Sequence, residues 1–312
     1  IATPAYGFKV FGTGKIYGDL PGTTTFDPAT WTTTNADMQN LKGIGVWETS
    51  RDVHISGVAV SRFKGEAVYY HSPQSVGVPR NIVFEGLHVF DVGFNALNFN
   101  AGALEGAVVR GCIVDGFSGQ CIEMSCGLME NNDLSGSIGS PIQTGGGGVF
   151  DVTIRHNKIK GGSLADHSAI SIIGASTNPL TKTVNVYGND IFESTGHAIY
   201  AAFVGRVNVH DNHINGYPAN RYGVFIESSV PHAEVVNNNL KNGGKTVFCD
   251  DLTKSVIRGN TGGDTATLND EASDRGIARM FATGWMVCNR AGALARECSA
   301  QGPARARAGA LG

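Results

Sequence analysis

The chain has 312 residues and a formal net charge of −3, and only 16% of its residues are charged. This balance offers no basic face for a nucleic acid, and no apolar run approaches the length of a membrane span. We therefore expect neither nucleic acid nor membrane as a partner. Glycine contributes 43 residues without the three-residue period of collagen, which excludes a triple helix.

The N-terminal part of the chain contains one short apolar segment, FGTGKIYG, followed by a threonine-rich stretch. We interpret residues 19–42 as a long loop inserted into the first structural unit, because they contain two prolines and no apolar alternation. Structureless loops of this length are uncommon unless they carry a function or are disordered.

One pattern then recurs along the chain with a period that drifts between 20 and 32 residues. Each unit contains alternating apolar residues, a small or polar pair, a ladder position and, after a short turn, a second apolar run. Alignment of the units on the ladder position gives one column of Val58, Leu87, Cys112, Asn132, Asn157, Asn189, Asn212, Asn238 and Asn260.

The two-residue alternation of valine and isoleucine predicts strands, and helical periodicity is nearly absent before residue 270. One such unit cannot bury its own apolar face, whereas stacked units can. Buried amides must find hydrogen-bond partners, so a column of six asparagines predicts a ladder of stacked side chains inside the stack. We expect an all-β, single-stranded parallel β-helix of about nine to eleven coils.

The asparagine column, the variable period and the entry segment with Gly12, Gly14 and Ile16 resemble the right-handed parallel β-helix of the pectate-lyase-like superfamily. The resemblance covers roughly residues 8–270. It implies a β-helix domain over residues 1–270 and a polysaccharide as the partner. It also implies a secreted or phage-particle location and a monomer or a homotrimer. The superfamily contains polysaccharide lyases, glycoside hydrolases, tailspike depolymerases and non-catalytic adhesins, so the fold leaves the function open.

Side chains of a strand alternate between its two faces, so the second apolar run of each unit presents one outward residue per coil. From the first coil to the last, this outward row is predicted to contain Trp47, Tyr69, Asn98, Glu123, Gln143, Ser171, Tyr200, Phe225 and Phe248. Its middle is polar and its ends are aromatic. Because exposed aromatic residues in a line are unusual without a partner, we interpret the row as the binding surface for an extended glycan.

β-Elimination from a uronic acid requires a group that neutralises the substrate carboxylate, a base that removes a proton and an acid that protonates the leaving oxygen. The row and its neighbours contain residues of all three kinds. The predicted catalytic residues are Glu123, His71, His197, Tyr200 and Arg221. The predicted substrate-binding residues are Trp47, Tyr69, Asn98, Asn100, Gln143, Ser171, Phe225 and Phe248. A polysaccharide lyase acting on an acidic glycan is the first hypothesis.

Two alternatives remain open. Glycoside hydrolysis requires two carboxyl groups, and Asp91, Asp115 and Asp166 are candidate partners for Glu123. A non-catalytic glycan-binding or tailspike-like module would use the same row without cleavage. No metal site is predicted from the spacing of residues, although a Ca²⁺ ion held by Glu123, Asn98 and a neighbour would be compatible with the oxygen ligands that calcium prefers.

The repeat ends before residues 271–312, which we interpret as a segment that caps the open end of the solenoid and continues into a basic tail. The six cysteines show no paired zinc-binding spacing. We expect them to be buried thiols, with a bridge between Cys288 and Cys298 as the alternative.

Overall fold

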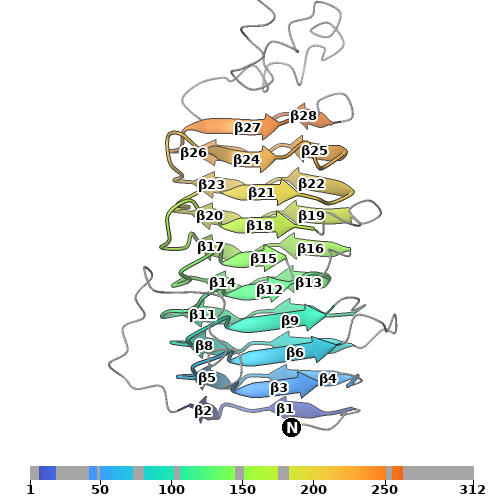
Figure 1. Ribbon diagram of the computed structural model, residues 1–312, viewed down its shortest axis with the longest axis vertical. Coiled ribbons are helices and arrows are strands. Elements are labelled where there is room, and N and C mark those ends of the chain that lie inside the picture. The colour runs from blue at the N-terminus through green and yellow to red at the C-terminus, as the bar shows by residue number, and fades with distance from the viewer. Residues whose placement is uncertain are drawn as a thin grey trace, which may run out of the picture.

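The computed structural model is a column of stacked parallel strands (Figure 1). The structure describes residues 7–18, 42–47, 50–72, 81–101, 106–144, 151–174, 183–250 and 255–262. All helical and strand structure in these ranges is strand, so they contain no helix that is long and apolar enough to cross a membrane. The predicted all-β parallel solenoid is confirmed.

Each coil contributes one strand to each of three parallel sheets. The first sheet contains β1 (Lys9–Phe11), β4 (Val53–Ser56), β7 (Ile82–Glu85), β10 (Val108–Arg110), β13 (Gly127–Glu130), β16 (Val152–Arg155), β19 (Thr183–Tyr187), β22 (Arg206–His210), β25 (His232–Val236) and β28 (Val256–Arg258). The second sheet contains β2 (Lys15–Tyr17), β5 (Ala59–Ser61), β8 (His88–Phe90), β11 (Ile113–Asp115), β14 (Asp133–Leu134), β17 (Lys158–Lys160), β20 (Asp190–Phe192), β23 (His213–Asn215) and β26 (Asn239–Lys241). The third sheet contains β3 (Ile44–Trp47), β6 (Val68–Ser72), β9 (Leu97–Ala101), β12 (Ile122–Met124), β15 (Ile142–Thr144), β18 (Ile170–Ile173), β21 (Ile199–Ala202), β24 (Tyr222–Ile226) and β27 (Lys245–Cys249).

The core lies between the three sheets and is built from the inward positions of the alternation. In the third sheet, Ile122, Ile142 and Ile170 are partners in consecutive strands, and all three are fully buried. Each coil therefore covers the apolar face of the next one, which is why no single coil forms a core by itself.

The corner between the first and second sheets is a tight turn that ends in the ladder position. The residue before each ladder asparagine has a positive φ, for example His156 at 54° and Asp211 at 55°. Only a few residue types accept this left-handed conformation readily, which accounts for the small or polar pair in the sequence pattern.

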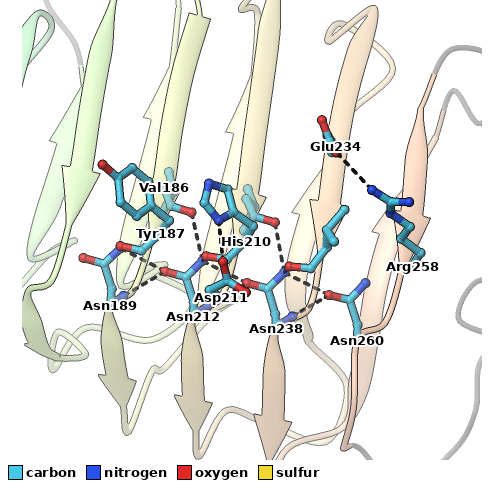
Figure 2. Close-up of polar contacts among 12 residues, drawn as sticks. Val186, Tyr187, Asn189, His210, Asp211, Asn212, Glu234, Asn238, Arg258 and Asn260 are labelled. Atoms are coloured by element: carbon cyan, nitrogen blue, oxygen red, sulfur yellow. Dashed lines mark hydrogen bonds and ion pairs between the residues drawn. The ribbon is translucent and has the colours of Figure 1, made fainter.

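The predicted asparagine ladder is confirmed from Asn132 to Asn260. The Nδ2 atom of each asparagine donates to the Oδ1 atom of the next at 2.8–2.9 Å. Figure 2 shows the side chains of Asn189, Asn212, Asn238 and Asn260 in one line. The same Oδ1 atoms accept backbone N–H groups, as between Asn157 N and Asn189 at 3.0 Å. The ladder therefore satisfies buried backbone groups at the corner as well as its own amides.

Several predictions concern residues outside the described ranges. The proposed inserted loop lies there except for Lys42, and so do residues 271–312 with Cys288 and Cys298. The domain boundary at residue 270 stays a prediction. The other four cysteines, Cys112, Cys121, Cys126 and Cys249, are buried free thiols.

Candidate functional site

The outward row of the third sheet has the predicted register over eight consecutive coils. Backbone pairing places the following residues side by side in this order: Tyr69, Asn98, Glu123, Gln143, Ser171, Tyr200, Phe225 and Phe248. Neighbouring strands lie about 4.8 Å apart, so each step along the row is close enough for side-chain contact.

The predicted position of Trp47 at the head of this row is wrong. Gly45 pairs with Tyr69, whereas Trp47 pairs with His71, which itself pairs with Asn100. The reason is that the inward alternation of β3 starts at Ile44, two residues later than the sequence alignment assumed. The backbones of Trp47, His71 and Asn100 thus form a second outward row, and their side chains lie outside the description.

A cluster of carboxyl and amide groups, the carboxyl cluster, surrounds Glu123 and consists of Lys42, Glu66, Asn95, Asn98 and Glu123. The Oε2 atom of Glu123 accepts hydrogen bonds from Asn95 Nδ2 at 2.5 Å and from Asn98 Nδ2 at 3.2 Å. Asn98 Nδ2 also donates to Glu66 Oε1 at 3.2 Å. The second carboxylate oxygen of Glu66 forms an ion pair with Lys42 at 2.9 Å. One amide thus joins two glutamates from coils on either side of it.

The electrostatics of the carboxyl cluster favour a proton on Glu123. Burial raises the pKa of Glu123 to about 7, and the negative charge of Glu66 raises it further in the same direction. Burial also raises the pKa of Glu66, but the hydrogen bond and charge of Lys42 oppose that effect. The two glutamates therefore differ, because only Glu66 has a cation beside it.

One oxygen of Glu123 is available for chemistry. Its Oε2 atom is occupied by the two amide donors, while no described residue contacts Oε1, and the side chain is partly exposed. In the next coil, Gln120 Nε2 donates to Gln143 Oε1 at 2.6 Å, which turns the Gln143 amino group away from that contact. A carboxyl group fixed in this way, with a pKa near neutrality, is suited to general acid catalysis.

Three residues predicted to contact substrate are too buried to do so in this conformation. Tyr69, Asn98 and Ser171 are 6%, 3% and 7% exposed. The Asn98 amide is occupied by the two glutamates, and the Tyr69 ring lies under Lys42, whose Nζ is 4.1 Å from the ring centroid. Strand alternation indicates which face a side chain points to, but it does not indicate what covers that face.

The aromatic end of the row stacks on itself. Phe225 lies 4.7 Å from Phe248 with an interplanar angle of 12°, and 6.0 Å from Tyr200 with an angle of 16°. The His197 ring is stacked 4.4 Å from Phe225. The faces of Phe225 are therefore occupied by neighbouring rings, which corrects the expectation that this residue offers an open stacking face to a sugar.

The predicted catalytic residues His197, Tyr200 and Arg221 belong to this aromatic end. Tyr200 is three strands from Glu123 along the row, or about 14 Å at the usual strand spacing. His197 Nδ1 accepts the backbone N–H of Tyr222 at 3.0 Å. A neutral imidazole has one acceptor nitrogen, so Nε2 of His197 carries the hydrogen and is a donor.

The other two polar groups at the aromatic end are also occupied. The Tyr200 hydroxyl donates to Glu227, and both burial and this contact raise the pKa of Tyr200. Arg221 forms an ion pair with Asp166. Burial and the charge of Arg221 lower the pKa of His197 to about 4, so its ring is neutral at physiological pH. None of these three predicted residues presents a proton acceptor.

The aspartates considered as partners for Glu123 all make contacts elsewhere. Asp115 belongs to the second sheet, where its carboxylate contacts His88 at 2.9 Å. Asp91 accepts the backbone N–H of Phe117 at 3.2 Å. Asp166 holds Arg221. The carboxylate that lies beside Glu123 is instead Glu66.

A calcium ion does not fit the carboxyl cluster as it is arranged. Asn95 and Asn98 turn their N–H groups toward Glu123, so they meet the carboxylate as donors and not as fellow oxygen ligands. Within the described ranges, no three or more side chains of His, Cys, Asp or Glu are grouped to hold a metal ion.

Sequence reasoning missed Glu66, Asn95 and Lys42 as members of the site. Glu66 and Asn95 occupy the same position in successive coils, two residues before the third-sheet strand, and each side chain reaches the outward row from the turn edge. The signal was the alignment of this edge position with the row. Lys42 follows the proposed insertion, where the repeat gives no register.

A model of one protein family, described as a right-handed β-helix region, matches residues 95–262. No curated protein and no solved structure matches the chain. Domains of this family occur in polysaccharide-acting enzymes and in binding modules, so the match does not identify a reaction.

Proposed function

We propose that this chain, which belongs to the right-handed β-helix family, cleaves a polysaccharide by hydrolysis, with Glu123 as the proton donor. One observation carries the proposal. Glu123 stands in the outward row with Oε2 fixed by two amides, Oε1 free of described contacts and a pKa of about 7. An acid of this kind protonates the glycosidic oxygen as the bond to the leaving group breaks.

Hydrolysis is favoured over β-elimination by the groups that are free to react. Elimination requires a base for the C5 proton, and His197, Tyr200 and Arg221 are committed to other contacts about three strands away. Hydrolysis uses a protonated and an ionised carboxyl group. Glu123 and the ion-paired Glu66 form such a pair, in which Glu66 is buried and acts through its charge.

The shape of the row supports a polymer as substrate. Gln143 stands next to Glu123 in the direction of the aromatic end, with its amino group turned away from Gln120. A glycan extended along the axis would cross Glu123 and Gln143 in sequence. Because such polymers lie outside cells, we propose a secreted or phage-particle protein that acts as a monomer or a homotrimer.

The test is digestion of a panel of neutral and acidic polysaccharides by the wild-type protein, Glu123→Gln and Glu234→Gln. Glu234 is a matched control because it lies in the first sheet, away from the row. We expect new reducing ends without the ultraviolet absorbance of an unsaturated uronate. We also expect their loss in Glu123→Gln and their retention in Glu234→Gln.

Two results would overturn the proposal. Unsaturated uronate products would show elimination, and unchanged turnover by Glu123→Gln would remove this residue from the reaction. Binding to a panel glycan without any new chain ends would identify a binding module.

A further inference from the structure

Glu66 and Glu123 are two coils apart in the chain fold, yet one amide connects them. Asn98 Nδ2 is 3.2 Å from Glu66 Oε1 and 3.2 Å from Glu123 Oε2, so these two oxygens lie no farther apart than twice that distance. Glu66 is 2% exposed and reaches Lys42 with its other oxygen. Its charge therefore acts on Glu123 with little screening by solvent.

We propose that Glu66 is a positioning residue for the reaction assigned above: its carboxylate, balanced by Lys42, retains the proton on Glu123 and fixes the Asn98 amide between the two glutamates. This inference rests on the proposed function for its catalytic meaning. Its physical content is that the pair shares one proton, and that content is measurable in the absence of any substrate.

The surroundings of Glu123 assign the effect to Glu66. Its hydrogen-bond donors from the turn before β9 and from β9 itself are the neutral amides of Asn95 and Asn98. Glu66 is the charged group whose field shifts the pKa of Glu123, and Lys42 contacts Glu66. The proton resides on Glu123 because Glu66 has the cation and Glu123 has none.

Two substitutions should move the titration of Glu123 in opposite directions. Glu66→Gln removes the negative charge, so the pKa of Glu123 should fall by about one unit or more. Lys42→Met removes the balancing cation, so the last proton of the glutamate pair should be lost at a higher pH. A purely structural role for these residues predicts no such opposite shifts.

The measurement is a pH titration of the side-chain carboxyl carbons by NMR in ¹³C-glutamate-labelled protein, with Glu123→Gln used to assign the signal. Glu130→Gln is the matched control, because Glu130 also forms an ion pair, with Arg155 at 2.6 Å, but in the first sheet. It should leave the Glu123 titration unchanged. Urea unfolding of each variant confirms that a shift occurs in folded protein.

Activity gives the second readout. With a polymer that the protein digests, the alkaline limb of the pH–rate profile should move to lower pH in Glu66→Gln and to higher pH in Lys42→Met. Opposite NMR shifts without any cleavage would leave the pairing intact and overturn the proposed function alone. Cleavage by the wild type, with a Glu123 titration that is unaltered in both variants, would overturn this inference alone.

Discussion

Replacement of Asn189 by leucine tests whether the ladder holds adjacent coils together. Its Oδ1 accepts from Asn157 N at 3.0 Å and from Asn157 Nδ2 at 2.9 Å, and its Nδ2 donates to Ile154 O and Asn212 Oδ1. Leucine leaves the Asn157 backbone N–H buried without its acceptor, which costs about 1–3 kcal/mol, and removes further bonds worth about 1 kcal/mol each. We expect a total loss of about 3–5 kcal/mol, a large part of the stability of a typical domain.

Urea unfolding followed by circular dichroism measures this loss as a lower midpoint at an unchanged slope. Asn185→Leu is the matched control, because Asn185 lies in the same coil, faces outward, is partly exposed and accepts one bond from Asn208 at 2.8 Å. We expect it to cost less than about 1 kcal/mol. If Asn189→Leu were no more damaging than the control, the ladder amides would not be what stabilises the corner.

Two further predictions concern ionisation. Since the pKa of Glu123 is raised from 4.5 to about 7 on folding, the folded state binds more protons between these values, so wild-type stability should fall by about 1–3 kcal/mol as pH rises through that window. Glu123→Gln should remove this slope in urea unfolding at several pH values, and an identical slope in both proteins would contradict the assignment. Burial raises the pKa of Cys112 and of Cys121 to about 12, so neither thiol should react with a disulfide reagent at pH about 8 until urea unfolds the chain. Peptide mapping that found either residue labelled in the folded protein would contradict this prediction.

The fold was predictable because a solenoid expresses its long-range contacts as a repeat. The ladder from Asn132 to Asn260 and the pairing of Glu123 with Asn98 and Gln143 both follow from aligning one coil with the next. In most folds such neighbours would not be related by any period, and their contact would not be readable from the chain.

The site was only partly predictable because side-chain direction and coverage are not periodic. The sequence pattern places Phe225 outward, but only the structure shows that the rings of Phe248 and His197 occupy its faces. Likewise, a glutamate at the turn edge is not distinguishable from a solvated one until the position of Asn98 shows that Glu66 points into the row. Each of these outcomes depends on rotamers and not on register.

The error at Trp47 shows why the center of the row is nevertheless secure. Trp47 follows residues 19–42, and an insertion of unknown path resets the alignment of the strand after it. The register of Glu123 has a different origin, because short turns and backbone hydrogen bonds connect its coil to both neighbours, as in Ile122 N to Pro141 O at 2.9 Å. A slip by one residue there would turn Ile122 and Met124 out of the core and Glu123 into it. The cost of burying that carboxyl group among apolar side chains maintains the outward orientation on which the proposed chemistry depends.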